Sequence, residues 1–526
     1  MQRKLFFGGK VLTVAEPLYA EAVMVENDRI AAVGSEAALR AAYTDFEEVD
    51  LGGGTLLPGF IDCHSHFPSI TTIHRVASVY YETTVDGIRK NLQNYIKTSG
   101  KRPGEWIFVR DYDETILDTG AHPTREEMDS LCPGYPVILH HRTGHCCVFN
   151  SLGMEVVGLT EDAPDIPNGI IGKDKNGRLT GYVSEAAFNH YRGKVHEIVR
   201  TDEEALADCE KAFAYYASAG FTTVQDGNCS LYWAKHYRHL ASEGKMPLDL
   251  IAFAQERAFP AVRDHIAEEP HNCLKLGGIK VFLDGCTGLR TALVRDPYPD
   301  SDACGIQSMT DERLRELFIL SAQNNVQILV HAIGDGAVDR FLDALESAAK
   351  EYPVLLTLRP IVLHCILMRE DQMARAKALG VTVSVLIHKI YLHGDFEREN
   401  LGEERMAYFT PAKTVLEAGV PLTFHADCPV YRPNVPEALA CAVTRETRKG
   451  SKLSGQEITV LDAIKAFTAT AAYQYFEEDI KGTIEVGKYA DFALLDGDPL
   501  TVPKENLRDL RVLATYKNGE CVYKQA

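Results

Sequence analysis

From about residue 201 to residue 481 the chain alternates between amphipathic segments of helical length and short apolar segments. The apolar segments are runs of Val, Ile and Leu that are too short to be buried helices. Alternating helices and apolar strands predict a parallel sheet covered by helices, because parallel strands need a long crossover connection. We therefore predict an α/β fold, and more specifically a (β/α)8 TIM barrel over residues 58–481.

The elements of this pattern can be placed by residue number. A capping-box spacing at Thr201 and Glu204 opens a helix with an apolar stripe. The closing helix is expected as one element over residues 458–476. The other expected strands are 221–227, 274 to about 280, 326–335, 359–365, 381–388 and 421–430, and the other expected helices are 311–325, 370–380 and 412–420.

Both ends of the chain carry short strand-like runs and hairpin signals. The turn at residues 26–29 separates two apolar runs, and Asn518-Gly519 separates two more near the C-terminus. Neither end has enough residues for a stable sheet of its own. We expect one small β-sandwich domain built from both chain ends, residues 1–57 and 482–526.

Residues 68–200 are less regular than the rest of the chain. Aromatic residues, Gly and Pro are mixed with short helical pieces, and a hairpin is expected around Asn176-Gly177. We interpret this region as a long insertion after the first barrel strand. Long ordered segments of this kind are often functional lids.

The segment LLPGFIDCHSHF, residues 56–67, reads as an apolar strand that leads into two histidines. Side chains alternate along a strand, so His64 and His66 reach a common point while Ser65 turns away. Neutral imidazole is a common metal ligand. Because the approach to these histidines is apolar, we favour a buried metal pair over two surface histidines.

Further polar side chains fall in or at the C-terminal halves of the later strands. They are Lys280, His331, His364 and Asp427. In a (β/α)8 barrel, catalytic residues converge at this end of the strands. Imidazole and carboxylate groups together ligate transition metals. Any one of these histidines could be a core residue, but the set predicts a metal centre.

The motifs PGFIDCHSHF, GGIKVFLDG, LVHAIGDGAV, RPIVLHC and TFHADCPV occur in this order along the chain. They resemble the amidohydrolase superfamily, and within it amidohydrolase family 3, the YtcJ-like branch of metal-dependent hydrolases. The segment that begins at Arg290, RTAL followed by PY, and the segment GKYADFALLDGDPL resemble the same branch. The resemblance covers nearly the whole chain.

This resemblance implies a binuclear centre of two divalent metals, usually zinc. The implied ligands are His64, His66 and Asp427 for the buried metal, His331 and His364 for the second, and Lys280 as the bridge. Lys280 would react with CO2, since a protonated lysine is a poor ligand and a carbamate supplies two anionic oxygens. The alternative is a lysine ammonium, paired with Asp284 or left alone, beside a single metal.

The activity that the resemblance implies is hydrolysis of a C–N amide-type bond, other than a peptide bond, in a small molecule. A metal-bridging hydroxide attacks the carbonyl carbon, while Asp427 acts as general base and then as general acid. Ester, lactone or cyclic-amide hydrolysis at the same centre is an alternative, and so is a non-catalytic metal-binding barrel. A nucleophilic Cys286 or Cys365 would not explain the histidine set.

Four further residues are candidate substrate contacts. The segment HHRTGHCCVFNS, residues 140–151, resembles loosely a family segment that lines the substrate pocket, and His145 matches it. Arg142 could bind a substrate carboxylate, or it could be a salt-bridged arginine. Arg290 lies in the family's RTAL segment, and His425 would share a strand face with Asp427 and either tune it or contact substrate.

Composition limits the partners. The formal net charge of −19 argues against non-specific binding to nucleic acid or to anionic membranes, both of which need basic patches. The 13 cysteines are scattered, and no apolar run is long enough for a membrane helix. We expect a cytoplasmic protein with a small-molecule substrate; a homodimer is expected from the family resemblance alone.

Overall fold

The computed structural model describes residues 2–167, 169–195, 201–269, 271–453 and 455–525. The chain forms two compact units. Unit 1 comprises Met1–Pro68 and Cys209–Ala526, and unit 2 comprises Ser69–Asp208. No helix in the described part of the chain combines the length and the apolarity needed to cross a lipid bilayer.

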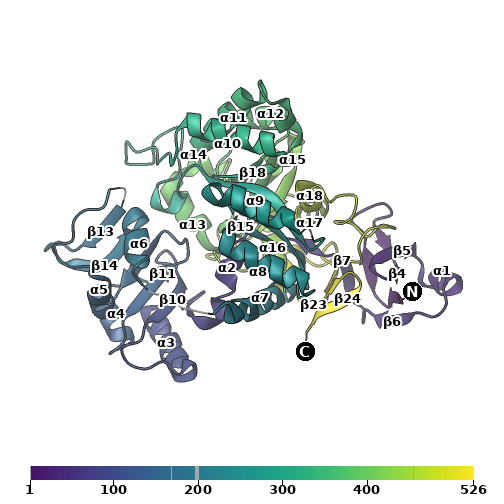
Figure 1. The fold of residues 1–526 in the computed structure, drawn as a ribbon, viewed down its shortest axis with the longest axis horizontal. Coiled ribbons are helices and arrows are strands. Elements are labelled where there is room, and N and C mark those ends of the chain that lie inside the picture. Colours follow the sequence, from purple (N-terminus) through teal and green to yellow (C-terminus); the bar gives the residue numbers. More distant parts are fainter. Residues whose placement is uncertain (1, 168, 196–200, 270, 454, 526) are drawn as a thin grey trace. The chain divides into compact units, whose positions relative to one another are not determined.

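An eight-stranded parallel sheet forms the centre of unit 1 (Figure 1). All its neighbouring strands pair in parallel, as the alternation of helices and apolar runs predicts. Its strands, in spatial order, are β8 (Phe60–Ile61), β15 (Phe221–Cys229), β16 (Asp249–Gln255), β17 (Leu274–Phe282), β18 (Gln327–Ala332), β19 (Ile361–His364), β20 (Thr382–Val385) and β21 (Leu422–Phe424).

Helices follow most of these strands along the chain. The expected capping box is confirmed, because Thr201 and Glu204 each accept a hydrogen bond from the other's backbone N–H. The expected helices at 311–325, 370–380 and 412–420 are also confirmed. The helices are α7 (Asp202–Ala217), α8 (Leu231–Ser242), α9 (Phe259–Glu268), α10 (Asp311–Asn324), α11 (Asp335–Ala349), α12 (Glu370–Ala378), α13 (Lys389–Leu401), α14 (Glu403–Met406), α15 (Ala412–Glu417) and α16 (Val435–Thr444).

The single closing helix expected over residues 458–476 is wrong. Two short helices, α17 (Val460–Lys465) and α18 (Ala469–Gln474), flank a break at Thr468, whose φ of −130° and ψ of −93° are not helical. The break lets the carbonyls of Ala466 and Phe467 accept hydrogen bonds from the backbone N–H groups of Phe424 and Ile61, at 3.2 and 2.8 Å. These donors belong to β21 and β8, the two edge strands of the parallel sheet, so tertiary bonding overrides local helix propensity.

Residues from strands that are far apart in the sheet order meet in one buried cluster. Ile61 of β8, Phe253 of β16 and Leu363 of β19 belong to this cluster, together with Tyr475 beside α18. A flat sheet would hold these side chains far apart, so the sheet is curled around its inner face. An isolated parallel bridge between Ser65 and Cys428 also joins the segments that follow β8 and β21.

Two further sheets of unit 1 are formed by the ends of the chain. Both predicted hairpins are confirmed, because β4 pairs with β5 and β23 pairs with β24, each in antiparallel register. One sheet has the order β5 (Arg29–Gly34), β4 (Ala22–Glu26), β1 (Arg3–Phe7) and β6 (Glu47–Asp50), with α1 (Glu36–Ala42) after β5; the other has the order β24 (Glu520–Lys524), β23 (Val512–Lys517), β22 (Phe492–Leu495), β7 (Thr55–Pro58), β2 (Lys10–Leu12) and β3 (Tyr19–Ala20). The second sheet thus contains strands from both chain ends.

Unit 2 is an α/β unit with its own apolar cores rather than an extended loop. The hairpin predicted around Asn176-Gly177 is confirmed as the antiparallel pair β13–β14. The strands, in spatial order, are β13 (Gly169–Lys173), β14 (Leu179–Ser184), β12 (Cys146–Phe149), β11 (Val137–His141), β10 (Ile107–Tyr112) and β9 (Ala77–Ser78), and the helices include α3 (Val85–Ser99), α4 (Arg125–Leu131), α5 (Ser151–Val157) and α6 (Glu185–Arg192).

Candidate metal centre

Two histidines converge on one carboxylate at the end of β8. The Nε2 atoms of His64 and His66 each lie 3.3 Å from Oδ1 of Asp427. The strand itself ends at Ile61, but backbone bridges from Ser65 to Cys428 after β21 and from His66 to Asp226 within β15 hold this stretch in place. The two rings thus reach a common point, as expected, although both residues lie beyond the end of the strand.

The orientation of the His64 ring is fixed by Gln225 on β15. His64 Nδ1 lies 2.7 Å from the side-chain oxygen of Gln225. The amide nitrogen of Gln225 donates to the carbonyl of Cys63 and to the hydroxyl of Tyr475, so the amide oxygen must face His64. Nδ1 therefore carries the proton and Nε2 presents its lone pair toward Asp427. Burial lowers the pKa of His64 to about 3, which keeps the ring neutral and able to bind a metal.

His364, the last residue of β19, is oriented by a chain of two hydrogen bonds. Its Nδ1 lies 3.1 Å from Nε2 of His425, and Nδ1 of His425 lies 2.9 Å from the hydroxyl of Ser384. Burial lowers the pKa of both histidines well below the usual value, so both rings are neutral. If each Nδ1–H donates along the chain, the lone pair of His364 is on Nε2.

His331 on β18 is oriented through its other nitrogen. Its Nε2 lies 2.9 Å from the backbone carbonyl of Gly285, so Nε2–H donates to that oxygen and the lone pair is on Nδ1. Its ring centroid lies 4.6 Å from that of His364. The two histidines thus form a second pair beside the pair made by His64 and His66.

Lys280 on β17 points into the same cluster. Its Nζ lies 3.4 Å from His64 Nε2, and the residue is only 1% exposed. Burial lowers the pKa of Lys280 to about 7, so a large fraction is neutral amine at neutral pH. Lys280 is not paired with Asp284, whose carboxylate instead accepts hydrogen bonds from the backbone N–H groups of Leu293, Ile333 and Gly334.

The carboxylate of Asp427 fits a metal ligand better than a hydrogen-bond acceptor. Oδ1 is buried, and among the described residues it has no hydrogen bond of normal geometry. Two ligand atoms about 2.0–2.1 Å from one tetrahedral ion lie roughly 3.3 Å apart, which matches the separation of Oδ1 from both Nε2 atoms. The donor set, imidazoles with a carboxylate, is also one that zinc takes.

Two of these residues have a strained backbone. His364 has a φ of 70° and Asp427 a φ of 52°, in the left-handed region that residues with side chains rarely adopt. Such strain persists only where the surroundings enforce it, and it occurs preferentially at functional sites.

The other predicted contact residues have different environments. The guanidinium of Arg290 donates to Asn400 and to the carbonyl of Pro299, so it supports local structure. His425 is fully buried, with both nitrogens engaged inside the protein. Arg142 and His145 belong to unit 2, where Arg142 stacks on Tyr80 and lies 3.6 Å from Asp113, while His145 lies 3.2 Å from Glu185.

Sequence reasoning missed the residues that orient the ligands. Gln225, Ser384 and the carbonyl of Gly285 each fix one histidine ring. Gln225 could have been found in the same way as the predicted ligands, because it is a polar residue within an apolar strand, β15. Ser384 gives a weaker signal, because serine is common in strands, and the carbonyl of Gly285 gives none.

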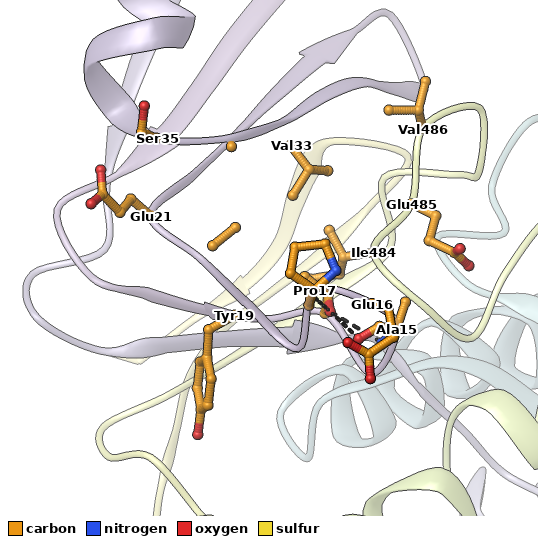
Figure 2. Close-up of a pocket in the computed structure, with 13 residues that line it drawn as sticks. Ala15, Glu16, Pro17, Tyr19, Glu21, Val33, Ser35, Ile484, Glu485 and Val486 are labelled. Carbon is orange, nitrogen blue, oxygen red and sulfur yellow. Dashed lines mark hydrogen bonds between the residues drawn. The ribbon is translucent and has the colours of Figure 1, made fainter.

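A separate cavity of about 610 Å³ lies among residues from both ends of the chain (Figure 2). Its lining includes the carboxylates Glu16 and Glu485 and the apolar side chains of Val33 and Ile484. None of the lining residues is His or Cys, so this cavity lacks the ligand set found at the strand ends.

Comparison with known proteins finds relatives that match the whole length of this chain. The chain is 26% identical over 542 residues to a putative amidohydrolase, YtcJ, of Bacillus subtilis strain 168, with 100% of both chains covered. It is 28% identical over 550 residues to an N-substituted formamide deformylase of Arthrobacter pascens, covering 100% of this chain and 99% of the relative.

A solved structure has a similar fold. An uncharacterized metal-dependent hydrolase from Pyrococcus horikoshii superimposes with a TM-score of 0.76 at 25% identity, over 96% of this chain and 99% of that one. A family model described as the amidohydrolase family matches residues 47–523, which include all six residues of the cluster. The chain belongs to the amidohydrolase family.

Proposed function

We propose that this protein is a metal-dependent hydrolase that cleaves a C–N amide-type bond, other than a peptide bond, in a small molecule. The observation that carries the proposal is the buried Oδ1 of Asp427, which lies 3.3 Å from two imidazole nitrogens and has no hydrogen bond of normal geometry among the described residues. The formamide deformylase among its relatives supports an amide-type bond.

We assign two divalent cations, most simply zinc, to the cluster. His64 Nε2, His66 Nε2 and Asp427 Oδ1 would hold the first, since Oδ1 lies 3.3 Å from each of the two nitrogens, a separation that fits ligands of one tetrahedral ion. His331 Nδ1 and His364 Nε2 would hold the second, since the other nitrogen of each ring is occupied by a protein group.

Lys280 would bridge the two ions as a carbamate. Only the neutral amine attacks CO2, and burial lowers the pKa of Lys280 to about 7, so the reactive form is present at neutral pH. In the described part of the chain no carboxylate lies within ion-pair distance of its Nζ. A buried amine that has no carboxylate at ion-pair distance gains from conversion to an anion that two cations neutralise.

The bound ions would supply Lewis acidity toward the substrate carbonyl and would lower the pKa of water toward neutrality. Burial alone would raise the pKa of Asp427, but the neighbouring imidazoles hold it well below its usual value, so the residue is a carboxylate. With Oδ1 directed at the first ion, we assign Oδ2 to accept the proton of the attacking water. The same oxygen would then deliver that proton to the leaving nitrogen.

The complete (β/α)8 barrel and a β-sandwich built from both chain ends are part of this proposal. The Ser65–Cys428 bridge and the curled sheet support a closed barrel. For the sandwich, the support is a shared core in which Phe6 and Val23 of one chain-end sheet pack with Phe492 and Tyr516 of the other. The strand ends that carry the ligands would then face one point at the rim.

The first experiment combines metal analysis with a substrate panel. The protein, freshly purified and then reconstituted with Zn²⁺, is expected to hold two ions per chain and to release amine from N-formyl or N-acyl compounds in a chelator-sensitive manner. Esters, lactones and cyclic amides belong in the same panel, because the same centre could hydrolyse them. One ion or none after reconstitution would contradict the binuclear assignment, and turnover of esters alone would overturn the assignment of bond type.

The carbamate has a test of its own. Lys280→Ala should lose one of the two ions and most activity, and short carboxylic acids such as propionate should partly restore both by occupying the vacated position. Lys280→Arg is the matched variant, since it keeps a long cationic side chain that cannot form a carbamate. Retention of two ions in either variant would contradict the bridge.

A further inference from the structure

Phe282 is an exposed aromatic residue beside the metal cluster. It is the last residue of β17 and lies two positions after Lys280, so the two side chains share one face of the strand. Phe282 is 41% exposed, whereas Lys280 is 1% exposed. The exposed ring therefore sits where a buried set of polar side chains first meets solvent.

Its contacts place one part of the ring against the cluster. The ring centroid lies 4.7 Å from Nζ of Lys280 and 5.6 Å from the ring centroid of His331, with an interplanar angle of 39°. These contacts fix the ring next to two groups that we assign to the metals. The remaining ring surface is the part that water reaches.

An exposed aromatic side chain alone carries no functional meaning, because apolar atoms make up much of any protein surface. The position of Phe282 is what distinguishes it. A flat apolar surface adjoining a set of convergent polar groups is the usual composition of a small-molecule site, in which apolar contact supplies affinity and the polar groups supply orientation. Phenylalanine also offers contact area with few rotatable bonds to immobilise.

We propose that Phe282 determines specificity by packing against an apolar substituent on the nitrogen of the scissile amide. This inference rests on the proposed function and narrows it to amides that carry an alkyl or aryl group on nitrogen. The relative described as an N-substituted formamide deformylase supports substrates of this type. Small, unsubstituted amides would bury none of the exposed ring and would gain nothing from it.

The test compares N-hexylformamide with N-methylformamide on the zinc-loaded full-length protein. Phe282→Ala should raise KM for N-hexylformamide by roughly 10–100-fold, the range expected for lost apolar contact in a pocket, with little change in kcat. KM for N-methylformamide should stay within about twofold, and Phe282→Leu should recover much of the affinity for the hexyl compound. Equal changes for both substrates, or no change for either, would overturn the proposal.

Two controls separate specificity from structural damage. Phe476→Ala removes another exposed phenylalanine of unit 1, 44% exposed and stacked on Arg359, and should leave both KM values unchanged. The metal content of Phe282→Ala should equal that of the unmodified protein. Loss of metal in this variant would assign Phe282 to support of the Lys280 region and would contradict a role in substrate recognition.

Failure of the proposed function gives a different result. If the unmodified protein hydrolyses no formamide at all, the proposed reaction fails, and calorimetry with N-hexylformamide then tests Phe282 separately. Binding to the zinc-loaded protein that weakens at least tenfold in Phe282→Ala supports the contact. Equal affinity in the two proteins, or no binding to either, rules it out.

Discussion

The molecule contains two clusters of histidine and carboxylate groups, one in each unit, and they differ in charge balance. In unit 1, Asp427 is surrounded by imidazoles whose pKa burial lowers, as for His64 and His364. In unit 2, Glu114 lies 2.7 Å from Nε2 of His141, and Asp113 lies 3.6 Å from Nε of Arg142. Both clusters bring three potential ligand atoms within 4.8 Å of one another.

The protonation state of histidine separates the two clusters. Burial alone would lower the pKa of His141, but its electrostatic interactions with Cys146 and Glu114 and a hydrogen bond to Asp113 raise that pKa well above its usual value. Two carboxylates then face two cations, His141 and Arg142, so the cluster is already neutral. The cluster of unit 1 has neutral imidazoles and a buried amine of lowered pKa, and it needs cations to balance Asp427. Ligand-type residues therefore indicate a metal only together with their charge balance.

The largest effect expected from this comparison is on catalysis by Asp427. Asp427→Asn keeps an oxygen for the metal but cannot accept and return a proton, so kcat should fall about 10²–10⁴-fold, the usual contribution of general acid–base catalysis. Metal content measured by elemental analysis should change much less than turnover. Unchanged kcat would show that Asp427 does not transfer the proton.

The second prediction concerns acid stability after the metals are removed by chelation. The folded pKa of His64 is about 3, below its unfolded value of 6.5, and the folded pKa values of His364 and His425 are also lowered. Below pH 6.5 the unfolded chain thus binds more protons than the folded one. The free energy of unfolding therefore falls from pH 6.5 toward pH 3, with His64 contributing up to about 1.4 kcal/mol per pH unit and with His364 and His425 acting in the same direction.

Over part of this pH range the His141 cluster of unit 2 should keep its contribution to stability while unit 1 loses stability. The folded pKa of His141 is raised, so its contribution is complete below pH 6.5 and is lost as the pH rises through the folded value. The folded pKa of Glu114 is lowered, because His141 outweighs burial, so its contribution persists down to about pH 4.5. Hydrogen exchange at pH 5 should show unit 1 opening while peptides near Glu114 stay protected. Equal loss of protection in both units would contradict the assigned charges.

Most of the fold follows from local pattern, because the hairpins, the capping box and the helices α10, α12 and α15 are encoded by residues close in sequence. The strand β16 was not predicted, because its central run LIAFA has no His, Lys or acidic residue of the kind that drew attention to its neighbours, and its polar residues Asp249 and Gln255 lie only at its ends. The break at Thr468 was not predictable either, because its gain comes from bonds to strands about 40 and 400 residues away.

The candidate site also combines features that are visible in the sequence with features that depend on contacts between distant segments. The residue types of the ligands and their positions at strand ends are visible in the sequence, so the six residues that we assign could be chosen from it. The partners of the second ring nitrogens are not visible, because Gln225, Gly285 and His425 reach His64, His331 and His364 only through the curvature of the sheet. These partners decide which nitrogen can bind a metal.

The third prediction tests one such partner. His425→Ala removes the acceptor for Nδ1–H of His364, so the ring should lose its fixed tautomer and orientation, and affinity for the ion assigned to His331 and His364 should fall about 10–100-fold. Affinity for the ion assigned to His64 and His66 should stay unchanged, as measured by competitive chelator titration. Ser384→Ala, one bond further out, is the matched variant and should have a smaller effect in the same direction.

The smallest expected effect concerns the histidine–carboxylate cluster of unit 2. Glu114→Gln removes a charge from the ion pair with His141, whose atoms lie 2.7 Å apart, and should lower the free energy of unfolding by about 1–2 kcal/mol. The loss should be the same with and without chelator, and metal content should equal that of the unmodified protein. Glu185→Gln, which alters the longer His145–Glu185 pair at 3.2 Å in the same unit, is the matched control and should cost less. Chelator-dependent destabilisation by Glu114→Gln would mean that this cluster also holds a cation, and charge balance would then fail to distinguish the two clusters.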